Sequence, residues 1–261
     1  MSILIEGRLF GLGCLLIVML SVWYYFEQAK RGEPPKVRRL PGFDAIDEAI
    51  GRAVEMGRPV FCSHGIGNMR DATYGPQTIA GLSVLDYVAR KCAEVGTRVI
   101  VPVRQTTVWP VASDIVETAY RIEGRPEEYD EDDVMFLSPQ QFGYSSSYMG
   151  LMEREQAGAN IMVGAYWAES LQLAETGQRV GAMQISGTAN THQLAFFVCA
   201  TDYALIGEEI FAAGAYATGD TDLMASLAGQ DVGRILAVIL MIIGILLITM
   251  GSEALLNLME M

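Results

Sequence analysis

Residues 60–103 read VFCSHGIGNMRDATYGPQTIAGLSVLDYVARKCAEVGTRVIVPV, and this stretch decides the fold. A short apolar run at Val60–Ser63 is followed by a helical pattern over Pro76–Val95 and by a second apolar run at Arg98–Val103. Short β-rich runs separated by helix-length segments are typical of βαβ units on a parallel sheet. Pro76 suits the first turn of a helix, because its missing N–H would have no partner there. The stretch therefore predicts an α/β fold.

The same alternation continues through the middle of the chain, behind a first amphipathic helix that Asp44 could cap. Further strands are predicted at Val134–Leu137, Ile161–Gly164, Ala182–Ser186 and Leu194–Cys199, and further helices at Thr107–Ile122, Gln140–Ala157, Tyr166–Thr176 and Tyr203–Ala217. The last two strands are joined only by Gly187–Gln193, which is too short for a crossover helix. We therefore expect a Rossmann-like, mostly parallel but mixed sheet sandwiched by helices.

Two charge-free stretches, Leu9–Phe26 and Ile235–Gly251, lie near the two ends of the chain. Each approaches the ~20 apolar residues that a helix needs to cross a bilayer. Five basic residues follow the first stretch, one precedes it, and none follows the second; the five are Lys30, Arg31, Lys36, Arg38 and Arg39. Basic residues stay on the cytoplasmic side, so both termini are expected outside.

These features divide the chain into six segments. We expect a short outer N-terminus at 1–8, a span at 9–26, a basic, Pro-containing linker at 27–42, a cytoplasmic α/β domain at 43–233, a second span at 234–251, and an outer tail at 252–261 that lengthens the helix or lies in the interface. A cleaved signal peptide is the alternative for the first span, but an A-x-A-like cleavage site is missing. The lipid bilayer is the first expected partner.

Composition excludes several classes of function. The net charge of −13 disfavours nucleic acid as a partner, because a phosphate backbone requires a basic surface. The four cysteines, Cys14, Cys62, Cys92 and Cys199, have no metal-ligand spacing and sit in apolar runs, as buried thiols do. The acidic run at 127–133 reads as a solvated loop, since it lacks EF-hand spacing. We expect neither a metal nor a cofactor.

A candidate ligand-binding crevice follows from the rule that open α/β sheets bind ligands beyond the carboxyl ends of their strands. Small or polar residues follow three of the predicted strands there, and Asp202 follows the last. The residues are Ser63, His64, Gly65, Gly67, Gln105, Thr106, Ser186, Gly187, Thr188, His192 and Asp202. The glycines could let backbone N–H groups approach an anion, although they match neither the dinucleotide fingerprint nor the P-loop.

Ordinary structural roles compete with each of these assignments. His64 and His192 are the only histidines, and two histidines make neither a zinc site nor a triad without further ligands. Cys62 lies in a buried strand without an electropositive neighbour, which favours an inert core thiol. Glycines serve turns more often than phosphates. No complete catalytic constellation is visible, so an enzyme is disfavoured.

Several short motifs resemble those of a known group of proteins. They are Arg39–Asp44 (RLPGFD), Gly57–Val60 (GRPV), Glu153–Glu155 (ERE), Gly187–Thr188 (GT) and Leu205–Glu209 (LIGEE). They resemble an uncharacterised family of prokaryotic two-pass membrane proteins that carry a domain of unknown function. The resemblance implies a prokaryotic cytoplasmic membrane and transfers no active site.

Two functions fit these observations. The first is a membrane-anchored structural or scaffolding protein whose domains assemble into a homo-oligomer, with other membrane proteins as further candidate partners. Small residues such as those of Phe211–Thr218 permit the close helix approach that assembly needs. The alternative is a membrane-tethered small-molecule sensor or enzyme that uses the crevice. Transport is disfavoured, because two spans without an internal charge form no polar path.

Overall fold

The computed structural model describes residues 9–33, 35 and 40–254. It divides into two compact units: Arg39–Thr218, and Met1–Arg38 together with Gly219–Met261. The first unit is the α/β domain, and the second is a pair of long helices. The predictions for residues 1–8, Pro34, Lys36, Arg38, Arg39 and the tail from 255 onward lie outside the described residues.

The α/β domain is built on a six-stranded sheet with the order β3-β2-β1-β4-β5-β6. The strands are β1 Val60–Gly65, β2 Val99–Val103, β3 Val134–Phe136, β4 Ala159–Ala165, β5 Met183–Thr188 and β6 Tyr203–Ile206. Every described strand pair is parallel. The first five predicted strands overlap β1 to β5, which confirms the α/β fold.

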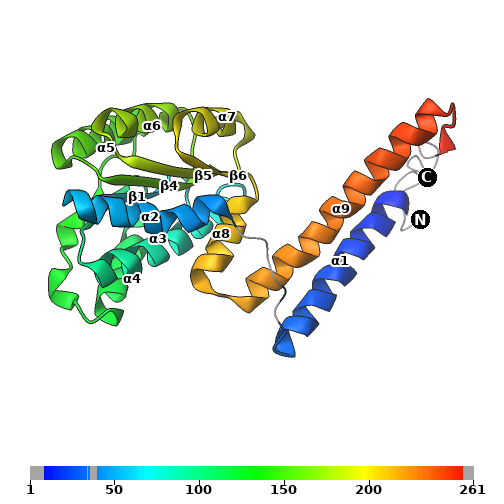
Figure 1. Ribbon diagram of the computed structural model, residues 1–261, viewed down its shortest axis with the longest axis horizontal. Helices are drawn as coiled ribbons and strands as arrows, with labels where there is room; N and C mark the ends of the chain where they lie inside the picture. The colour runs from blue at the N-terminus through cyan, green and yellow to red at the C-terminus, as the bar shows by residue number, and fades with distance from the viewer. Residues whose placement is uncertain (1–8, 34, 36–39, 255–261) are drawn as a thin grey trace. The chain divides into compact units, whose positions relative to one another are not determined.

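Helices cover both faces of this sheet (Figure 1). One face carries α2 Pro41–Met56, α3 Gly75–Val95, α4 Trp109–Ile122 and α8 Glu209–Thr218, and the other carries α5 Gln141–Glu155, α6 Glu169–Val180 and α7 Thr191–Ala200. Two short 3-10 turns, η1 Pro126–Glu128 and η2 Glu131–Asp133, precede β3. Pro76 lies in the first turn of α3, as predicted.

The expectation of a mixed sheet is wrong, because the last βα unit was misassigned. The predicted strand Leu194–Cys199 lies inside α7, and the predicted helix Tyr203–Ala217 begins with the strand β6. A short apolar run cannot be assigned to helix or strand by periodicity alone. With α7 as a ten-residue helix, β5 and β6 have the crossover that a parallel pair requires.

The largest buried side chains lie between the sheet and the α5–α7 layer. Phe61 of β1 stacks on Tyr148 of α5 with ring centroids 5.8 Å apart, and Tyr166 meets Phe197 of α7 edge-on at 5.3 Å. All four are fully buried. Removing an aromatic side chain from such a core costs about 3–5 kcal/mol. This core packs the start of β1 against α5 and the residue after β4 against α7.

The second unit consists of α1 Leu9–Lys30 and α9 Thr221–Thr249, which run antiparallel side by side (Figure 1). A Cβ on Gly229 would lie 2.6 Å from the Cα of Val22, so the two backbones nearly touch there. The Ser21 hydroxyl donates to the carbonyl of Gly229 at 3.0 Å. Small residues allow such close approach between helices.

Both long helices have the length and composition of a membrane span. Each contains an 18-residue apolar window of which none is buried within the structure. The helices are longer than the predicted spans, since α1 continues past Phe26 to Lys30 and α9 begins at Thr221, well before Ile235. The first residues predicted as linker are therefore helical.

Candidate functional site

The sheet changes its winding direction between β1 and β4. From β1 the chain steps outward to β2 and β3, and from β4 it steps outward the other way to β5 and β6. The loop after β1 leads to α3 on one face of the sheet, and the loop after β4 leads to α6 on the other face. In open α/β sheets, ligands bind in the crevice at such a switch point. The crevice predicted after the first strand lies at this place.

The backbones of β1 and β4 approach each other very closely there. Gly65 and Gly164 have φ angles of +83° and +148°, which disfavour any other residue. A Cβ on Gly164 would collide with the carbonyl of His64, and a Cβ on Gly65 would collide with that of Ala165. Gly65 was predicted to admit an anion, but the structure uses it to bring two strands together.

A small pocket of about 90 Å³ opens at the switch point. Two of the predicted residues, Gly67 and Gln105, line it. The remaining lining residues are Ile66, Asn68, Asp71, Tyr74, Arg104, Ala165 and Trp167. The rings of Tyr74 and Trp167 meet edge-on, 5.1 Å apart. Thr106 is exposed in the turn after β2 and does not line the pocket.

Arg104 and Gln105 hold the loop that forms one wall of this pocket. Arg104 Nη1 and Gln105 Nε2 both donate to the carbonyl of Ile66, at 3.0 and 3.2 Å. Asp71 Oδ1 accepts from the backbone N–H groups of Thr73 and Tyr74 at 2.8 and 3.1 Å. The pocket thus combines one cation, one carboxylate and two aromatic rings. Such a lining suits a small polar ligand and supplies no nucleophile with a base.

Ser63 and His64 lie behind the pocket and are fully buried. The Ser63 hydroxyl lies 2.8 Å from the hydroxyl of Tyr144, and its carbonyl accepts from Tyr166 at 2.9 Å. Burial raises the pKa of the Tyr144 hydroxyl, which therefore stays protonated. Ser63 is consequently part of the core hydrogen-bond network, closed to an external ligand.

His64 is the one buried group without a hydrogen-bond partner on either ring nitrogen in the part of the chain that the structure describes. Burial lowers the pKa of His64 from 6.5 to about 4. The imidazole is therefore neutral at physiological pH. Because His64 does not line the pocket, the structure gives it no contact with a ligand there.

Ser186, Gly187 and Thr188 are buried in β5, where they join neighbouring elements. The Ser186 hydroxyl lies 2.7 Å from that of Thr201, and Thr188 Oγ1 donates to Gln77 Oε1 at 3.4 Å. A Cβ on Gly187 would come within 2.9 Å of Leu205 and Ile210. These three residues join β5 to β6, α3 and α8, so the structure gives them packing roles within the domain.

The two remaining predicted residues lie away from the pocket. His192 is exposed on the first turn of α7. Asp202 precedes β6 and therefore stands at the amino edge of the sheet, where its carboxylate accepts from the backbone N–H of Gln184 at 2.7 Å. The prediction for Asp202 is wrong because the last strand was placed before this residue instead of after it. Asp202 lines a different hollow of about 390 Å³.

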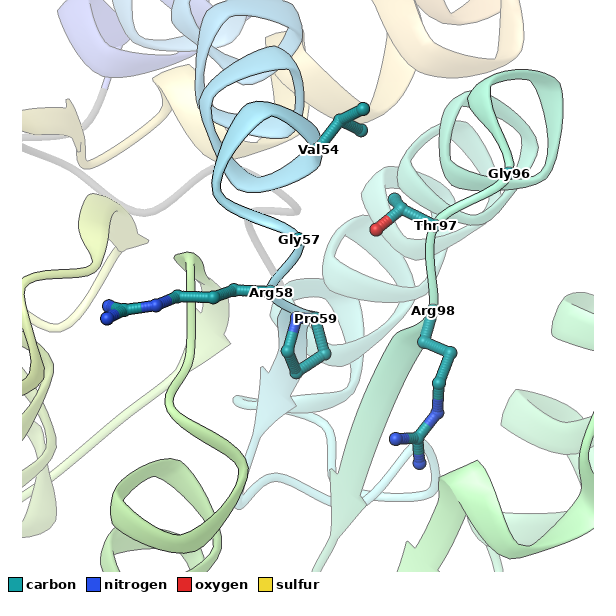
Figure 2. Close-up of a pocket in the computed structure, with 7 residues that line it drawn as sticks. All are labelled: Val54, Gly57, Arg58, Pro59, Gly96, Thr97 and Arg98. Carbon is teal, nitrogen blue, oxygen red and sulfur yellow. The ribbon is translucent and has the colours of Figure 1, made fainter.

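A further hollow of about 280 Å³ lies at the amino edge of β1 and β2 (Figure 2). Gly57 and Gly96 end α2 and α3 there in the left-handed conformation. Arg58 and Arg98 line the hollow, but their guanidinium groups point away from its centre (Figure 2). Arg58 donates to the carbonyl of Val180 at 3.2 Å. Neither guanidinium group therefore faces the centre of this hollow.

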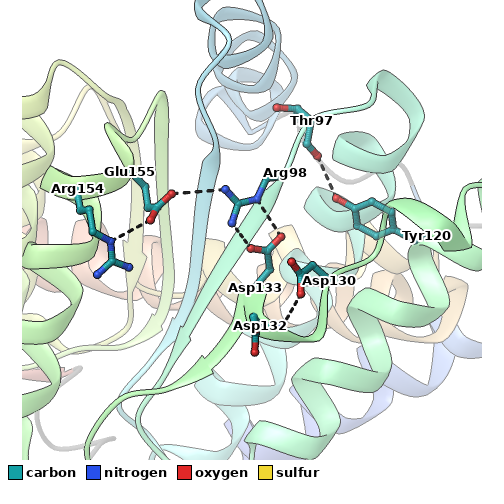
Figure 3. A network of polar contacts seen from close by, with 8 residues as sticks. All are labelled: Thr97, Arg98, Tyr120, Asp130, Asp132, Asp133, Arg154 and Glu155. Carbon is teal, nitrogen blue, oxygen red and sulfur yellow. Dashed lines mark hydrogen bonds and ion pairs between the residues drawn. The ribbon is translucent and has the colours of Figure 1, made fainter.

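Arg98 instead belongs to a polar network at the end of the acidic run (Figure 3). It donates to both carboxylate oxygens of Asp133, at 2.5 and 3.3 Å, and to Glu155 at 3.5 Å. Burial raises the pKa of Asp133, and the Arg98 hydrogen bonds offset part of that effect. Asp133 thus differs from the solvated loop residue that the sequence predicted. No group of three metal-ligating side chains is found within the described ranges.

The structure shows one surface that the sequence did not predict, at the edge of the sheet formed by α7 and β6 (Figure 1). Four large apolar side chains are exposed on these two elements: Phe196, Val198, Tyr203 and Ile206, which we call the α7–β6 surface. Cys199, also expected to be buried, is exposed on α7. The available signal was the absence of Asp, Glu, Lys and Arg from Thr191–Ala200, a composition that a buried strand shares.

Comparison with known proteins gives one finding. The family model described as "Domain of unknown function (DUF6754)" matches residues 2–259, nearly the whole chain. Neither the curated proteins nor the solved structures provided a match.

Proposed function

The chain belongs to the family described as "Domain of unknown function (DUF6754)", and we propose that it is a membrane-anchored scaffold whose α/β domains associate into a homo-oligomer. One observation carries the proposal. The α7–β6 surface exposes four large apolar side chains. The chain has 49 charged residues, 18 basic and 31 acidic, but none of them occupies these four positions. Large apolar side chains that are exposed together on two neighbouring elements favour an interaction site there.

The membrane setting is part of the proposal. The helices α1 and α9 have the length and composition of spans. Lys30 and Arg31 follow the apolar part of α1, and the sequence adds Lys36, Arg38 and Arg39. Basic residues favour the cytoplasmic side, which supports a cytoplasmic α/β domain with both termini outside. The resemblance of the sequence motifs supports a prokaryotic cytoplasmic membrane.

A second copy is the occupant that best fits the α7–β6 surface. The sequence between Arg179 and Arg234 contains no Lys or Arg, which disfavours docking on anionic lipid. The strand β6 is the last strand in the sheet order, and the N–H of Ile206 in it donates to Glu209 Oε2 at 2.9 Å. Two identical edges pair readily across a two-fold axis, and anchoring in one bilayer raises the encounter rate of copies.

The test is the native mass of the full chain in mild detergent. The exposed fractions of Ile206 and Ile122 are 52% and 55%, but Ile122 lies on α4, away from the α7–β6 surface. We expect the wild type and Ile122→Glu to be oligomeric and Ile206→Glu to dissociate. A bismaleimide should also join copies through the exposed Cys199. A monomeric wild type, or an Ile206→Glu variant of unchanged mass, would contradict the proposal.

A second candidate function is supported by the pocket at the switch point. Its volume of about 90 Å³ and its lining by Arg104, Gln105 and Trp167 suit a small polar molecule, which would make the protein a membrane-tethered sensor or enzyme. Native mass spectrometry of gently purified protein would detect such a molecule. Arg104→Gln should lose it, whereas Arg121→Gln on the surface of α4 should keep it. A wild type without a bound small molecule argues for the scaffold alone.

A further inference from the structure

The contact between α1 and α9 fixes which residues lie at the same level. Gly229 packs against Val22, and a Cβ on Gly233 would lie 3.0 Å from Val18. Four residues along α9 thus correspond to four residues back along α1, as expected for antiparallel helices. Continuing this register puts Asp231 level with Leu20 and Arg234 level with Ile17.

The apolar stretches of the two helices are therefore staggered. The apolar stretch of α1 ends at Phe26, near the C-terminal end of that helix, and Phe26 is level with Ala225 of α9. The charge-free stretch of α9 begins only at Ile235. At 1.5 Å per residue the offset is about 15 Å, half the thickness of the hydrocarbon core. One bilayer cannot match the inner ends of both stretches.

An ion pair occupies the offset region. Arg234 Nη2 lies 2.8 Å from Asp231 Oδ1, and both side chains are about half exposed, at 45% and 46%. With about 100° of rotation per residue, Asp231 and Arg234 fall on the side of α9 opposite to Gly229. The pair therefore faces away from α1, toward whatever surrounds the hairpin.

The hydrocarbon core can be matched to the apolar stretch of α1 or to that of α9, and a single copy of the chain fits neither position. If the hydrocarbon core covers the apolar stretch of α1, the Asp231–Arg234 pair faces lipid, where charged side chains are costly and require partners. If the core covers only the stretch of α9, Met19, Leu20 and Trp23 project beyond it although 59–66% of each is exposed. In both cases, contact with another protein helix near Asp231 and Arg234 would stabilise the helix pair.

We propose that the α9 helices of two copies pack against each other through this face, with Asp231 of each copy bonded to Arg234 of the other. The proposal rests on the self-assembly proposed above and assigns it a contact within the membrane. A second copy in the same bilayer presents the same acid and base at the same depth. Asp231 and Arg234 lie about one turn apart on α9. A two-fold axis along the membrane normal therefore brings Asp231 of each copy beside Arg234 of the other.

The first test is the dimer dissociation constant of the full chain in nanodiscs. Asp231→Asn and Arg234→Gln should each raise it about fivefold or more, as for other polar contacts between membrane helices. The double swap Asp231→Arg with Arg234→Asp should restore it. Glu27→Gln is the matched control, because the Glu27–Arg31 pair of α1 lies beyond the apolar stretch.

The second test is disulfide formation, which does not depend on removing the ion pair. In a Cys14→Ser, Cys199→Ser background, Val238→Cys lies on the same outer face as Asp231 and should cross-link two copies. Leu236→Cys points toward α1 and should not cross-link. Equal cross-linking at the two positions, or a dissociation constant that neither single substitution changes, would overturn this contact.

The two assembly surfaces can fail separately. If Ile206→Glu dissociates the oligomer and Asp231→Asn does not, the α7–β6 surface stands and the membrane contact is overturned. If Asp231→Asn weakens the oligomer and the swap restores it, the membrane contact is supported whatever Ile206→Glu does. A monomeric wild type overturns both.

Discussion

Asp202 and Gln184 are joined by two hydrogen bonds that start the last strand pair of the sheet. The backbone N–H of Gln184 donates to Asp202 Oδ2 at 2.7 Å, and the backbone N–H of Asp202 donates to the carbonyl of Gln184 at 3.1 Å. The carboxylate of Asp202 thus accepts the hydrogen bond from Gln184 that a backbone carbonyl of a neighbouring strand would otherwise accept. This places the carboxylate at the amino edge, where it sets the register of the edge strand.

Replacing Asp202 with Ala should loosen β6. The substitution leaves the N–H of Gln184 without its acceptor, so the free energy of unfolding should fall by about 1 kcal/mol. Amide hydrogen exchange at Gln184 and in β6 should accelerate, while β1 should be unaffected. Asp202→Asn retains an oxygen acceptor and should exchange nearly as slowly as the wild type. Equal exchange rates in Asp202→Ala and the wild type would contradict the role of this bond.

The buried His64 should make the domain sensitive to acid. Its pKa is about 4 in the folded chain against an ordinary value of 6.5, so the unfolded chain takes up the proton first. Stability is therefore complete above about pH 6.5 and falls as the pH drops toward 4, by about 3 kcal/mol from this group alone.

Chemical denaturation at pH 7 and pH 4.5 measures this effect. His64→Leu removes the titrating group and two unpartnered nitrogens, so its free energy of unfolding should match or exceed that of the wild type at pH 7. Its loss on acidification should be smaller than that of the wild type. His192→Gln is the control, a histidine substitution at an exposed position on α7 that leaves the buried His64 in place.

Two helical glycines should respond oppositely to alanine. In α3 a Cβ on Gly81 would collide with the carbonyl of Val163 and lie 2.9 Å from the Cα of His64, so Gly81→Ala should cost about 2–4 kcal/mol. In α2 nothing lies within 4 Å of a Cβ on Gly51, and Gly51→Ala should gain up to about 1 kcal/mol. Thermal unfolding of the two variants checks both signs. A shift in the same direction would refute the close packing at Gly81.

Removing Arg98 should destabilise the domain by about 2 kcal/mol, because Asp133 is buried and would lose the guanidinium that offsets its desolvation. Arg121→Met is the control: Arg121 pairs with Glu117 on the exposed surface of α4, where a pair contributes at most about 1 kcal/mol. Adding Asp133→Asn to Arg98→Met should recover part of the loss. Urea denaturation that ranks the two arginine variants equally would contradict the burial argument.

The sequence predicted the fold well where a short apolar run is followed by a long helical segment. Val60, Val99 and Val134 begin strands that the apolar runs locate to within a residue. The prediction failed at Leu194–Cys199, where six apolar residues form part of α7 and expose Phe196 and Val198. A helix that exposes apolar side chains has the composition of a buried strand, so composition alone misleads there.

The site was predicted only in part, for two physical reasons. Gly67 and Gln105 reach the switch-point pocket because the strand-end rule needs only the positions of β1 and β2. His64 and Ser63 were placed beside a ligand, but alternation along a strand buried on both faces sends each side chain into a helix layer. Pocket residues such as Tyr74 and Trp167 come from loop geometry, which no spacing in the sequence encodes.

The hydrogen bond between Ser21 and Gly229 joins residues that are 208 positions apart. A ribosome that adds about 5–20 residues per second needs roughly 10–40 s to pass from one to the other. During that interval the newly made α/β domain folds while tethered by α1 alone. Translation that stalls before α9 would therefore leave a folded domain joined to α1, with the Val18 and Val22 face of α1 open to other helices.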